Sequence, residues 1–387
     1  MSKQDKVVLP GSTIGILGGG QLGRMITLAG KAMGYRFVTL DPVNDCPCAQ
    51  VADEYIQSEY LDEQGATILS QKSSIITYEF ENVNASIVEY IEEISDVPQG
   101  SKLLKITQNR ITEKTTIASM GIPTAPFQVV DSEVALTKSI ETLGLPVVMK
   151  TATGGYDGKG QWVIRSNQDL IEAAKAFQHP FYQGIEFIIE QFVPFEKELS
   201  VIVARNRKGE VETFPVAENI HCNNILHMSI VPARVQAASL KAAQAIAIKI
   251  ANHLELVGLL AVEMFYNQDG SIYINELAPR PHNSGHYTMD ACITTQFEQH
   301  IRAICNLPLG RTDLLSPVVM MNLLGQHMED FYTLIPSLPK EIKFHLYGKK
   351  EAIVNRKMGH INILSETINQ ALDIADQLSV FREKQTC

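Results

Sequence analysis

The alternation of apolar runs with helical patterns in the first hundred residues most constrains how this chain can fold. The segments STIGIL (12–17), YRFVTLD (35–41) and SIITYEF (74–80) have the apolar character of buried strands, and helical patterns beginning near Gln21 and Asp62 separate them. Strand–helix–strand order with short loops predicts a parallel sheet covered by helices on both faces. The N-terminal part is therefore expected to be a Rossmann-like domain.

The pattern changes after about residue 110. A glycine and two prolines in MGIPTAP (120–126) mark a boundary, and the strands and helices that follow are typical of a small antiparallel sheet covered by helices. Longer strand patterns then predict a larger antiparallel sheet. The expected class is α/β together with α+β, with domains over residues 1–110, 111–197 and 198–387, the last ending in a small β subdomain from about 310.

The first glycine-rich stretch, GGGQLGRM (18–25), has the G-x-G-x-x-G spacing of a dinucleotide-binding turn. Asp41, about 20 residues further on, fits the acidic position of that fingerprint. A dehydrogenase is therefore one hypothesis for this chain. It leaves unexplained a second glycine loop, a pair of carboxylates and a basic cluster near the C-terminus.

The charge balance limits the partners of the chain. The formal net charge is −10 at pH 7, and a nucleic-acid-binding protein needs a basic face, so no nucleic acid is expected. No stretch reaches the length of a membrane span, and no signal-peptide pattern opens the chain, so we expect a cytoplasmic protein without a membrane partner. Any anionic ligand must be met by local clusters of lysine and arginine.

The second glycine loop, TGGYDGKGQ (153–161), lies between two strand patterns and follows Lys150. Glycines in such a loop expose backbone N–H groups that can hold phosphate oxygens, and Lys150 and Lys159 add positive charge. The loop is not a Walker motif, which would have to open a helix. A phosphate site is favoured over an ordinary hairpin.

The segment EQFVPFEKE (190–198) is a strand end that could contact an adenine edge with its backbone. Glu190 could accept a hydrogen bond from the exocyclic amine, and Glu198 could bind ribose hydroxyls. Solvated glutamates are the alternative, since strands often end in such residues. The interpretation depends on the neighbouring motifs.

Two glutamates on a predicted hairpin suggest a metal site. The strands LLAVEMF and SIYINEL are joined by NQDG, and with that turn Glu263 and Glu276 share one face as diagonal neighbours roughly 7–8 Å apart. Mg²⁺ commonly uses one or two carboxylates together with nucleotide phosphates. In this register Asn275 lies on the opposite face, and a slip by one residue would weaken the metal interpretation.

Two further motifs carry positive or hydrogen-bonding groups. APRPHNSGH (278–286) presents Arg280, His282 and Asn283 on a proline-bounded loop suited to a small planar anion, with zinc on its histidines as a disfavoured alternative. YGKKEAIVNRKMGH (347–360) gathers four basic residues. That basic cluster can be interpreted either as a second anion pocket or as a solvated turn.

These motifs in this order resemble the ATP-grasp superfamily and, within it, the 5-(carboxyamino)imidazole ribonucleotide synthases of purine biosynthesis. The motifs that carry the resemblance are GGGQLGRM, TYEFENV, QNRITEK, GYDGKGQ, EQFVPFEKELS, INELAPRPHNSGH and NRKMGHINIL, which together span essentially the whole chain. Asn355 stands where the family usually has glycine. The resemblance implies an ATP-grasp fold in which residues 111–197 form a small α+β lid.

The resemblance also implies a set of site residues. It places ATP on Arg110, Lys150, Gly155, Tyr156, Asp157, Gly158, Lys159, Gly160, Gln161, Glu190, Gln191, Phe192, Val193, Glu198, His221, Asn275 and Glu276, with Mg²⁺ on Glu263 and Glu276. It places 5-aminoimidazole ribonucleotide on Gly20, Gln21, Leu22, Glu79, Tyr156, Asp157, Lys349, Lys350 and Arg356. It assigns bicarbonate to Arg280, His282 and Asn283, with Tyr156 and Asp157 among the catalytic residues.

The activity implied is ATP-dependent carboxylation of the exocyclic amine of 5-aminoimidazole ribonucleotide through carboxyphosphate. Asp157 and His282 are the candidates for proton transfer, and the sequence does not rank them. A homodimer is expected because two-fold dimers are the commonest assemblies. The remaining alternatives are the dehydrogenase and a binding protein without catalytic activity.

Overall fold

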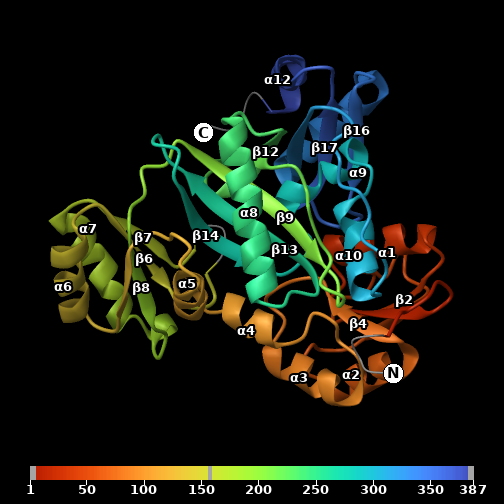
Figure 1. Ribbon diagram of the computed structural model, residues 1–387, viewed down its shortest axis with the longest axis horizontal. Helices are drawn as coiled ribbons and strands as arrows, with labels where there is room; N and C mark the ends of the chain where they lie inside the picture. Colours follow the sequence, from red (N-terminus) through yellow and green to blue (C-terminus); the bar gives the residue numbers. More distant parts are fainter. Residues whose placement is uncertain (1–5, 156–158, 382–387) are drawn as a thin grey trace. The chain divides into compact units, whose positions relative to one another are not determined.

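The computed structural model describes residues 6–155 and 159–381 (Figure 1). The chain divides into two compact units. The first unit comprises residues 1–104, 199–262 and 278–387, and the second comprises residues 105–198 and 263–277. The predicted division into three domains remains a prediction.

The N-terminal part of the first unit contains a four-stranded parallel sheet of order β3-β2-β1-β4 within the described residues. Its strands are β1 (Thr13–Leu17), β2 (Arg36–Asp41), β3 (Glu54–Gln57) and β4 (Ile75–Tyr78). Its helices are α1 (Gln21–Ala32), α2 (Glu63–Lys72), α3 (Ala85–Ile94) and α4 (Lys102–Thr107). The predicted strands, the helix from Gln21 and the Rossmann-like sheet are confirmed.

Parallel pairing brings two distant loops to one edge of this sheet. Leu17 of β1 lies opposite Tyr78 of β4, so Gly18 and Glu79 leave the sheet side by side. The apolar face of α1, which includes Met25 and Ile26, packs with Phe297 of α10 (Gln296–Ile304) in one buried cluster. The glycine turn is thus fixed between a strand end and a helix held by the core.

A larger, mainly antiparallel sheet has the order β14-β13-β9-β11-β12-β15-β17-β16, with β10 beside β9. Most of its strands belong to the first unit, whereas residues 263–277, which include nearly all of β14, belong to the second. Its strands are β9 (Lys197–Arg205), β10 (Val211–Thr213), β11 (Ala217–Cys222), β12 (Ile225–Val231), β13 (Gly258–Tyr266), β14 (Ile272–Ala278), β15 (Val318–Leu324), β16 (Ile342–Leu346) and β17 (Lys357–Leu364). The accompanying helices are α8 (Ala237–His253), α9 (Thr288–Ala291), α11 (Met328–Leu334) and α12 (Ile368–Gln377). The C-terminal strands continue this sheet, because β15 pairs with β12.

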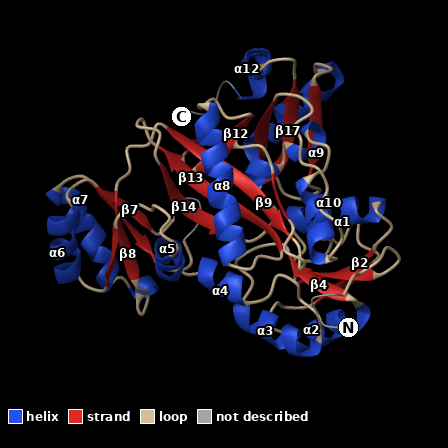
Figure 2. Ribbon diagram, in the orientation of Figure 1, coloured by secondary structure: helices blue, strands red, loops and turns tan. Residues whose placement is uncertain are grey.

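The second unit contains an antiparallel sheet of order β5-β8-β6-β7. Its strands are β5 (Phe127–Val130), β6 (Val147–Thr151), β7 (Gln161–Ile164) and β8 (Phe187–Gln191), and its helices are α5 (Arg110–Ser119), α6 (Glu133–Leu143) and α7 (Asn167–Ala174). Helices α6 and α7 lie on one side of the sheet and α5 on the other (Figure 2). The small antiparallel sheet with helices predicted from the sequence is confirmed.

The start of α5 is set by its N-cap. The Asn109 side chain accepts hydrogen bonds from the backbone N–H groups of Ile111 and Thr112, which have no partner inside the helix. Arg110 therefore occupies the first turn, and Lys114 follows four residues later on the same face. The side chain of Arg110 forms an ion pair with Glu276, and that of Lys114 forms one with Glu190.

Candidate active site

The glycine turn after β1 is closed by carboxylates of the chain itself. The N–H groups of Gly20 and Gly23 donate to the two oxygens of Glu79, the second at 2.5 Å, and the N–H of Gly19 donates to Asp41 at 2.7 Å. These are the donors that would bind a dinucleotide pyrophosphate. Asp41 also accepts from the backbone N–H of Val43. Because the turn's N–H groups already donate to these carboxylates, the structure disfavours the dinucleotide interpretation.

Glu79 occupies a buried position beside the turn, with 5% of its surface exposed. Burial, together with the neighbouring Asp41, raises the pKa of Glu79 to about 7, although the two backbone N–H bonds and the positive charge of Lys349 oppose the shift. A Cβ at Gly20 would lie 2.6 Å from a Glu79 oxygen. The turn therefore requires glycine next to this carboxyl group.

The C-terminal basic segment reaches the same region of the first unit. The side chain of Gln50 donates to the backbone oxygen of Gly348 at 2.9 Å, which ties the segment before Lys349 to the N-terminal sheet domain. Lys349 donates to the backbone oxygen of Lys357 at 2.7 Å and lies 5.8 Å from the ring centre of Tyr347. Burial, with nearby Arg356, lowers the pKa of Lys349 to about 8.

Lys350 and Arg356 of this segment are exposed, and Lys357 is half-buried. Lys350 forms an ion pair with Asp45 at 3.3 Å, and Arg356 donates to the backbone oxygen of Glu351 at 3.3 Å. Gln21 begins α1 and is half-buried, and Leu22 is buried. The structure thus gathers Gly20, Glu79 and Lys349 closely, with Lys350 and Arg356 on the surface of the same segment.

Arg280, the first predicted bicarbonate ligand, is held by a carboxylate that the sequence interpretation did not single out. Its guanidinium forms a two-point ion pair with Glu81, with one contact at 2.6 Å, and donates to the backbone of Pro281 at 3.1 Å. Arg280 holds the pKa of Glu81 below its usual value in spite of burial. Glu81 lies two residues after Glu79, and the quoted motif TYEFENV contains both.

His282 is neutral and its ring orientation is fixed. Burial and the nearby Arg280 and Lys357 lower its pKa well below the usual value. Its Nδ1 accepts from the backbone N–H of Ser284 at 3.3 Å and contacts the Ser284 hydroxyl at 2.9 Å. The neutral ring therefore carries its proton on Nε2, where it can donate to an anion oxygen.

Two buried amide side chains hold the loop around His282. Gln296 accepts from the backbone N–H of His282 at 2.9 Å and donates to its carbonyl oxygen at 2.8 Å. Asn283 and Asn322 exchange amide hydrogen bonds of 2.8 and 2.9 Å, and Asn322 also donates to the backbone of Leu226. Sequence reasoning missed Gln296 and Asn322, because neither lies in a motif near the loop.

A buried ion cluster organises the second unit. One carboxylate oxygen of Glu190 lies 3.3 Å from the Nζ of Lys114, and the other lies 3.1 Å from the Nζ of Lys150. Lys114 is fully buried, and Lys150 and Glu190 are nearly so. Although burial opposes ionisation, the two ammonium groups hold the pKa of Glu190 at about 2. Each carboxylate oxygen of Glu190 thus contacts one lysine, and its expected role as a side-chain acceptor for adenine stays a prediction.

Arg110 and Glu276 form a second ion pair in this unit, 3.2 Å apart. Glu113, three residues after Arg110 on α5, accepts a hydrogen bond from the backbone N–H of Leu277 at 2.7 Å. Burial and the neighbouring Glu276 raise the pKa of Glu113 to about 8. Lys114 was missed by the sequence interpretation although it lies in QNRITEK. Its spacing of four from Arg110 was the available signal.

The predicted phosphate loop joins β6 to β7. Lys150 pairs with Gln161 across the strands, and the N–H of Thr151 donates to Gly160 at 2.9 Å. Gly160 has φ of +70°, and a Cβ there would lie 2.7 Å from the Thr151 hydroxyl. Gly155 is half-buried and Lys159 is exposed. Tyr156, Asp157 and Gly158 lie outside the described residues.

The strand end after β8 offers backbone groups. The N–H of Gln191 donates to Pro126 and that of Phe192 to Pro146, at 2.8 and 3.1 Å. Of the backbone N–H groups of Gln191, Phe192 and Val193, all within the described residues, the one without a backbone acceptor is that of Val193, which could bind a nucleotide. Glu198, on β9, is half-buried.

The remaining predicted ligands lie on sheet strands. Glu263 is on β13, and Asn275 and Glu276 are on β14, all half-buried. His221 in the first unit lies at a register shift between β11 and β12, where a bulge redirects a side chain. The described residues contain no group of three His, Cys, Asp or Glu side chains that could hold a metal ion. Two carboxylates still suit Mg²⁺ when phosphates complete its shell.

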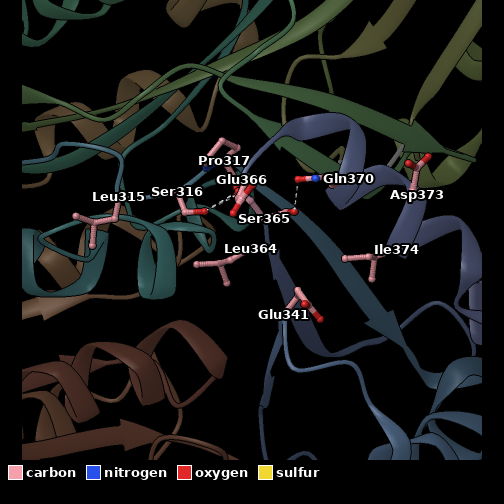
Figure 3. A pocket seen from close by; sticks show the side chains of 10 residues that line it. All are labelled: Leu315, Ser316, Pro317, Glu341, Leu364, Ser365, Glu366, Gln370, Asp373 and Ile374. Carbon is pink, nitrogen blue, oxygen red and sulfur yellow. Dashed lines mark hydrogen bonds between the residues drawn. The ribbon is translucent and has the colours of Figure 1, made fainter.

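A cavity of about 950 Å³ in the first unit is lined by none of these residues (Figure 3). Its lining includes the carboxylates of Glu341, Glu366 and Asp373 and no basic side chain. Such a lining does not suit a phosphate-bearing ligand. The cavity is therefore not assigned to the substrates.

The fold and these charged groups define an ATP-grasp ligase. Residues 115–297 match the ATP-grasp domain, residues 11–108 match the ribonucleotide synthetase preATP-grasp domain, and residues 318–373 match the phosphoribosylaminoimidazole carboxylase C-terminal domain. The chain is 51% identical to N5-carboxyaminoimidazole ribonucleotide synthase of Bacillus subtilis (strain 168), over 95% of this chain and 94% of the relative. It therefore belongs to the N5-carboxyaminoimidazole ribonucleotide synthase family, the ligases of the ATP-dependent carboxylation step in purine biosynthesis.

Solved structures agree with this assignment. An ADP complex of an N5-carboxyaminoimidazole ribonucleotide synthetase has a TM-score of 0.93 and 55% identity, covering 97% of this chain and 98% of that one. The Aspergillus clavatus enzyme, in complex with ADP and 5-aminoimidazole ribonucleotide, has a TM-score of 0.84 and 29% identity, covering 94% and 98%. No helix among the described residues is long and apolar enough to cross a membrane.

Proposed function

We propose that the second unit binds the nucleotide of the reaction. Lys150 and Arg110, with Lys159 and the glycine loop through Gln161, would bind the phosphates, and the backbone at Gln191 to Val193 would bind the adenine. Two buried lysines share the single carboxylate of Glu190, so the cluster carries one positive charge in excess. This excess is the observation that carries the proposal, because a buried surplus charge calls for an anion.

Mg²⁺ is proposed at Glu263 and Glu276, with Asn275 beside them. Both carboxylates lie on sheet strands and are half-buried, and hard oxygen ligands of this kind suit the ion. When bound, Mg²⁺ would neutralise charge on the phosphoryl group during its transfer. Glu198 is proposed for the ribose, and His221 for the nucleotide.

The first unit is proposed to bind 5-aminoimidazole ribonucleotide. Gly20, Gln21 and Leu22, with Glu79, would hold the imidazole and ribose, and Lys349, Lys350 and Arg356 would bind its phosphate. The side chain of Arg356 is exposed to solvent and donates to the backbone oxygen of Glu351. An exposed guanidinium suits phosphate binding. The Aspergillus relative binds the same nucleotide, which supports the substrate class.

Bicarbonate is proposed at Arg280, His282 and Asn283. An oxygen of bicarbonate would attack the γ-phosphorus of ATP, breaking the bond to ADP and forming carboxyphosphate. Carboxyphosphate would then break into CO₂ and phosphate, and the phosphate keeps the bicarbonate proton. The amine nitrogen would bond to CO₂ and lose one proton, which gives the carbamate product.

Within this scheme His282 acts as a hydrogen-bond donor. Its Nδ1 accepts from Ser284, so the proton on Nε2 would bind a bicarbonate or carboxyphosphate oxygen. This role differs from the proton transfer for which His282 was a candidate. Residues 111–197 are proposed to act as the lid that excludes water, because escaping CO₂ would waste ATP.

The test is release of ADP from Mg-ATP and bicarbonate, with and without 5-aminoimidazole ribonucleotide. Strong stimulation by the nucleotide is the expected result. ADP release that does not respond to it would retain the ATP chemistry and reject the acceptor. Absence of any ADP release by folded protein would reject the proposal.

We propose further that the protein acts as a cytoplasmic homodimer. ATP, bicarbonate and a purine precursor are cytoplasmic metabolites, and two-fold dimers are the commonest oligomers. Sedimentation equilibrium would give a mass of about twice 42.9 kDa for the dimer. A mass equal to one chain at micromolar concentration would reject it.

A further inference from the structure

Lys114 is a buried lysine whose charge the proposed function counts but to which it assigns no ligand. It lies on α5 with none of its surface exposed. Its ammonium group contacts a Glu190 oxygen at 3.3 Å and donates to the backbone oxygen of Ile274 at 3.2 Å. A fully buried ammonium group is costly unless it has a specific partner. Lys114 therefore requires an explanation.

The charges around Glu190 suggest one. Lys114 and Lys150 each contact a different oxygen of the same carboxylate. The positive charge of Lys114 offsets the negative charge of Glu190, so the charge of Lys150 remains available to an anion. Without Lys114, Lys150 and Glu190 would form a closed, neutral pair. The same lysine also anchors β14 one residue before Asn275.

We propose that Lys114 is a positioning residue for nucleotide binding, which neutralises Glu190 so that Lys150 can bind the phosphates of ATP. This inference rests on the proposed assignment of Lys150 to those phosphates. Lys114 does not itself touch the nucleotide. It acts through the carboxylate of Glu190, which lies between the two lysines.

The pKa shifts are consistent with this arrangement. Burial lowers the pKa of Lys150, and the carboxylate of Glu190 opposes that shift. Lys114 adds a second contribution that favours the ionised carboxylate of Glu190, whose pKa lies well below its usual value. Glu190 is therefore ionised at neutral pH, as this arrangement requires.

The test compares binding of a non-hydrolysable Mg-ATP analogue to four variants by titration calorimetry. Lys114→Met should raise the dissociation constant about tenfold or more, because the phosphates lose most of the charge of Lys150. The double variant Lys114→Met/Glu190→Gln should recover affinity to within about threefold of the parent, because Lys150 again carries an unopposed charge. Lys150→Met should lose affinity, and Lys138→Met, an exposed lysine of α6, should not.

Recovery in the double variant separates charge balance from packing, since a structural defect at Lys114 would persist when Glu190 is also changed. An unchanged affinity in Lys114→Met, or a double variant no better than the single one, would overturn the inference. If Lys150→Met also kept full affinity, the proposed phosphate site itself would be wrong. The KM for 5-aminoimidazole ribonucleotide should stay within about twofold in Lys114→Met, and a parallel loss would indicate general disruption.

Discussion

Glu276 is the residue on which the proposed metal site depends most. It lies on β14, is half-buried, and pairs with Arg110 at 3.2 Å. Glu276→Gln keeps the size of the side chain but removes the charge that would hold Mg²⁺ and orient Arg110. ADP release should fall by about 100-fold or more, because metal stabilisation of the phosphoryl group contributes several kcal/mol.

The control for this variant is Glu141→Gln on α6, an exposed glutamate of the same unit, which should keep the parent rate. Thermal unfolding of both variants establishes that they fold. An unchanged rate of ADP release in Glu276→Gln would reject the metal assignment.

Arg356 tests the other half of the reaction. Its side chain is exposed and donates only to a backbone oxygen among the bonds described, that of Glu351. Arg356→Ala should raise the KM for 5-aminoimidazole ribonucleotide about tenfold, which is the usual effect of removing one charged hydrogen bond to a phosphate. The KM for ATP should not change, and a selective loss of ATP binding would contradict the placement.

At the residue scale, the sequence identified charged groups better than it identified their partners. Lys150, Glu190 and Arg280 were all singled out, but the pairing of Glu190 with Lys114 and of Arg280 with Glu81 was not. Ion pairs between segments far apart in the chain leave no periodic signal. The tertiary structure alone brings such groups together.

At the scale of elements, most of the strand and helix pattern was predictable. The three N-terminal strands and the helix from Gln21 were confirmed because apolar periodicity and glycine spacing act locally. The group that the N–H donors of the glycine turn bind was not predictable in the same way. Glu79 reaches the turn only because β1 and β4 are parallel neighbours, so the carboxylate takes the place that a dinucleotide phosphate would need.

This turn should make stability depend on pH. The pKa of Glu79 is raised to about 7 in the folded protein, mainly by burial, and is roughly 4.3 in an unfolded chain. The folded state thus binds more protons between these values, and its stability should fall as the pH rises from about 4.3 through 7. A pKa difference of about 2.7 corresponds to a loss of roughly 4 kcal/mol from this one group.

Guanidinium unfolding at pH 5 and pH 8 measures this effect. Glu79→Gln should reduce the difference in unfolding free energy between the two pH values, whatever its effect on stability at either one. Glu93→Gln, an exposed glutamate of α3, should keep the parent difference. The same pH difference in Glu79→Gln and in the parent would contradict the raised pKa of Glu79.

At the scale of the whole molecule, the path of the chain predicts cooperative unfolding. The chain passes between the two units at residues 104/105, 198/199, 262/263 and 277/278. Strands β13 and β14 run through two of these points. Neither unit is a single continuous segment, so unfolding of one unit must disturb the strands of the other.

Calorimetry should therefore show one transition that responds to both ligands. A Mg-ATP analogue at 100 times its dissociation constant should add about 2.7 kcal/mol to the stability of the folded protein, and 5-aminoimidazole ribonucleotide should do the same. Each ligand alone should move the entire transition to higher temperature, since the binding free energy is shared by a cooperative structure. Two separate transitions, each moved by one ligand, would show instead that the units unfold independently despite the shared strands.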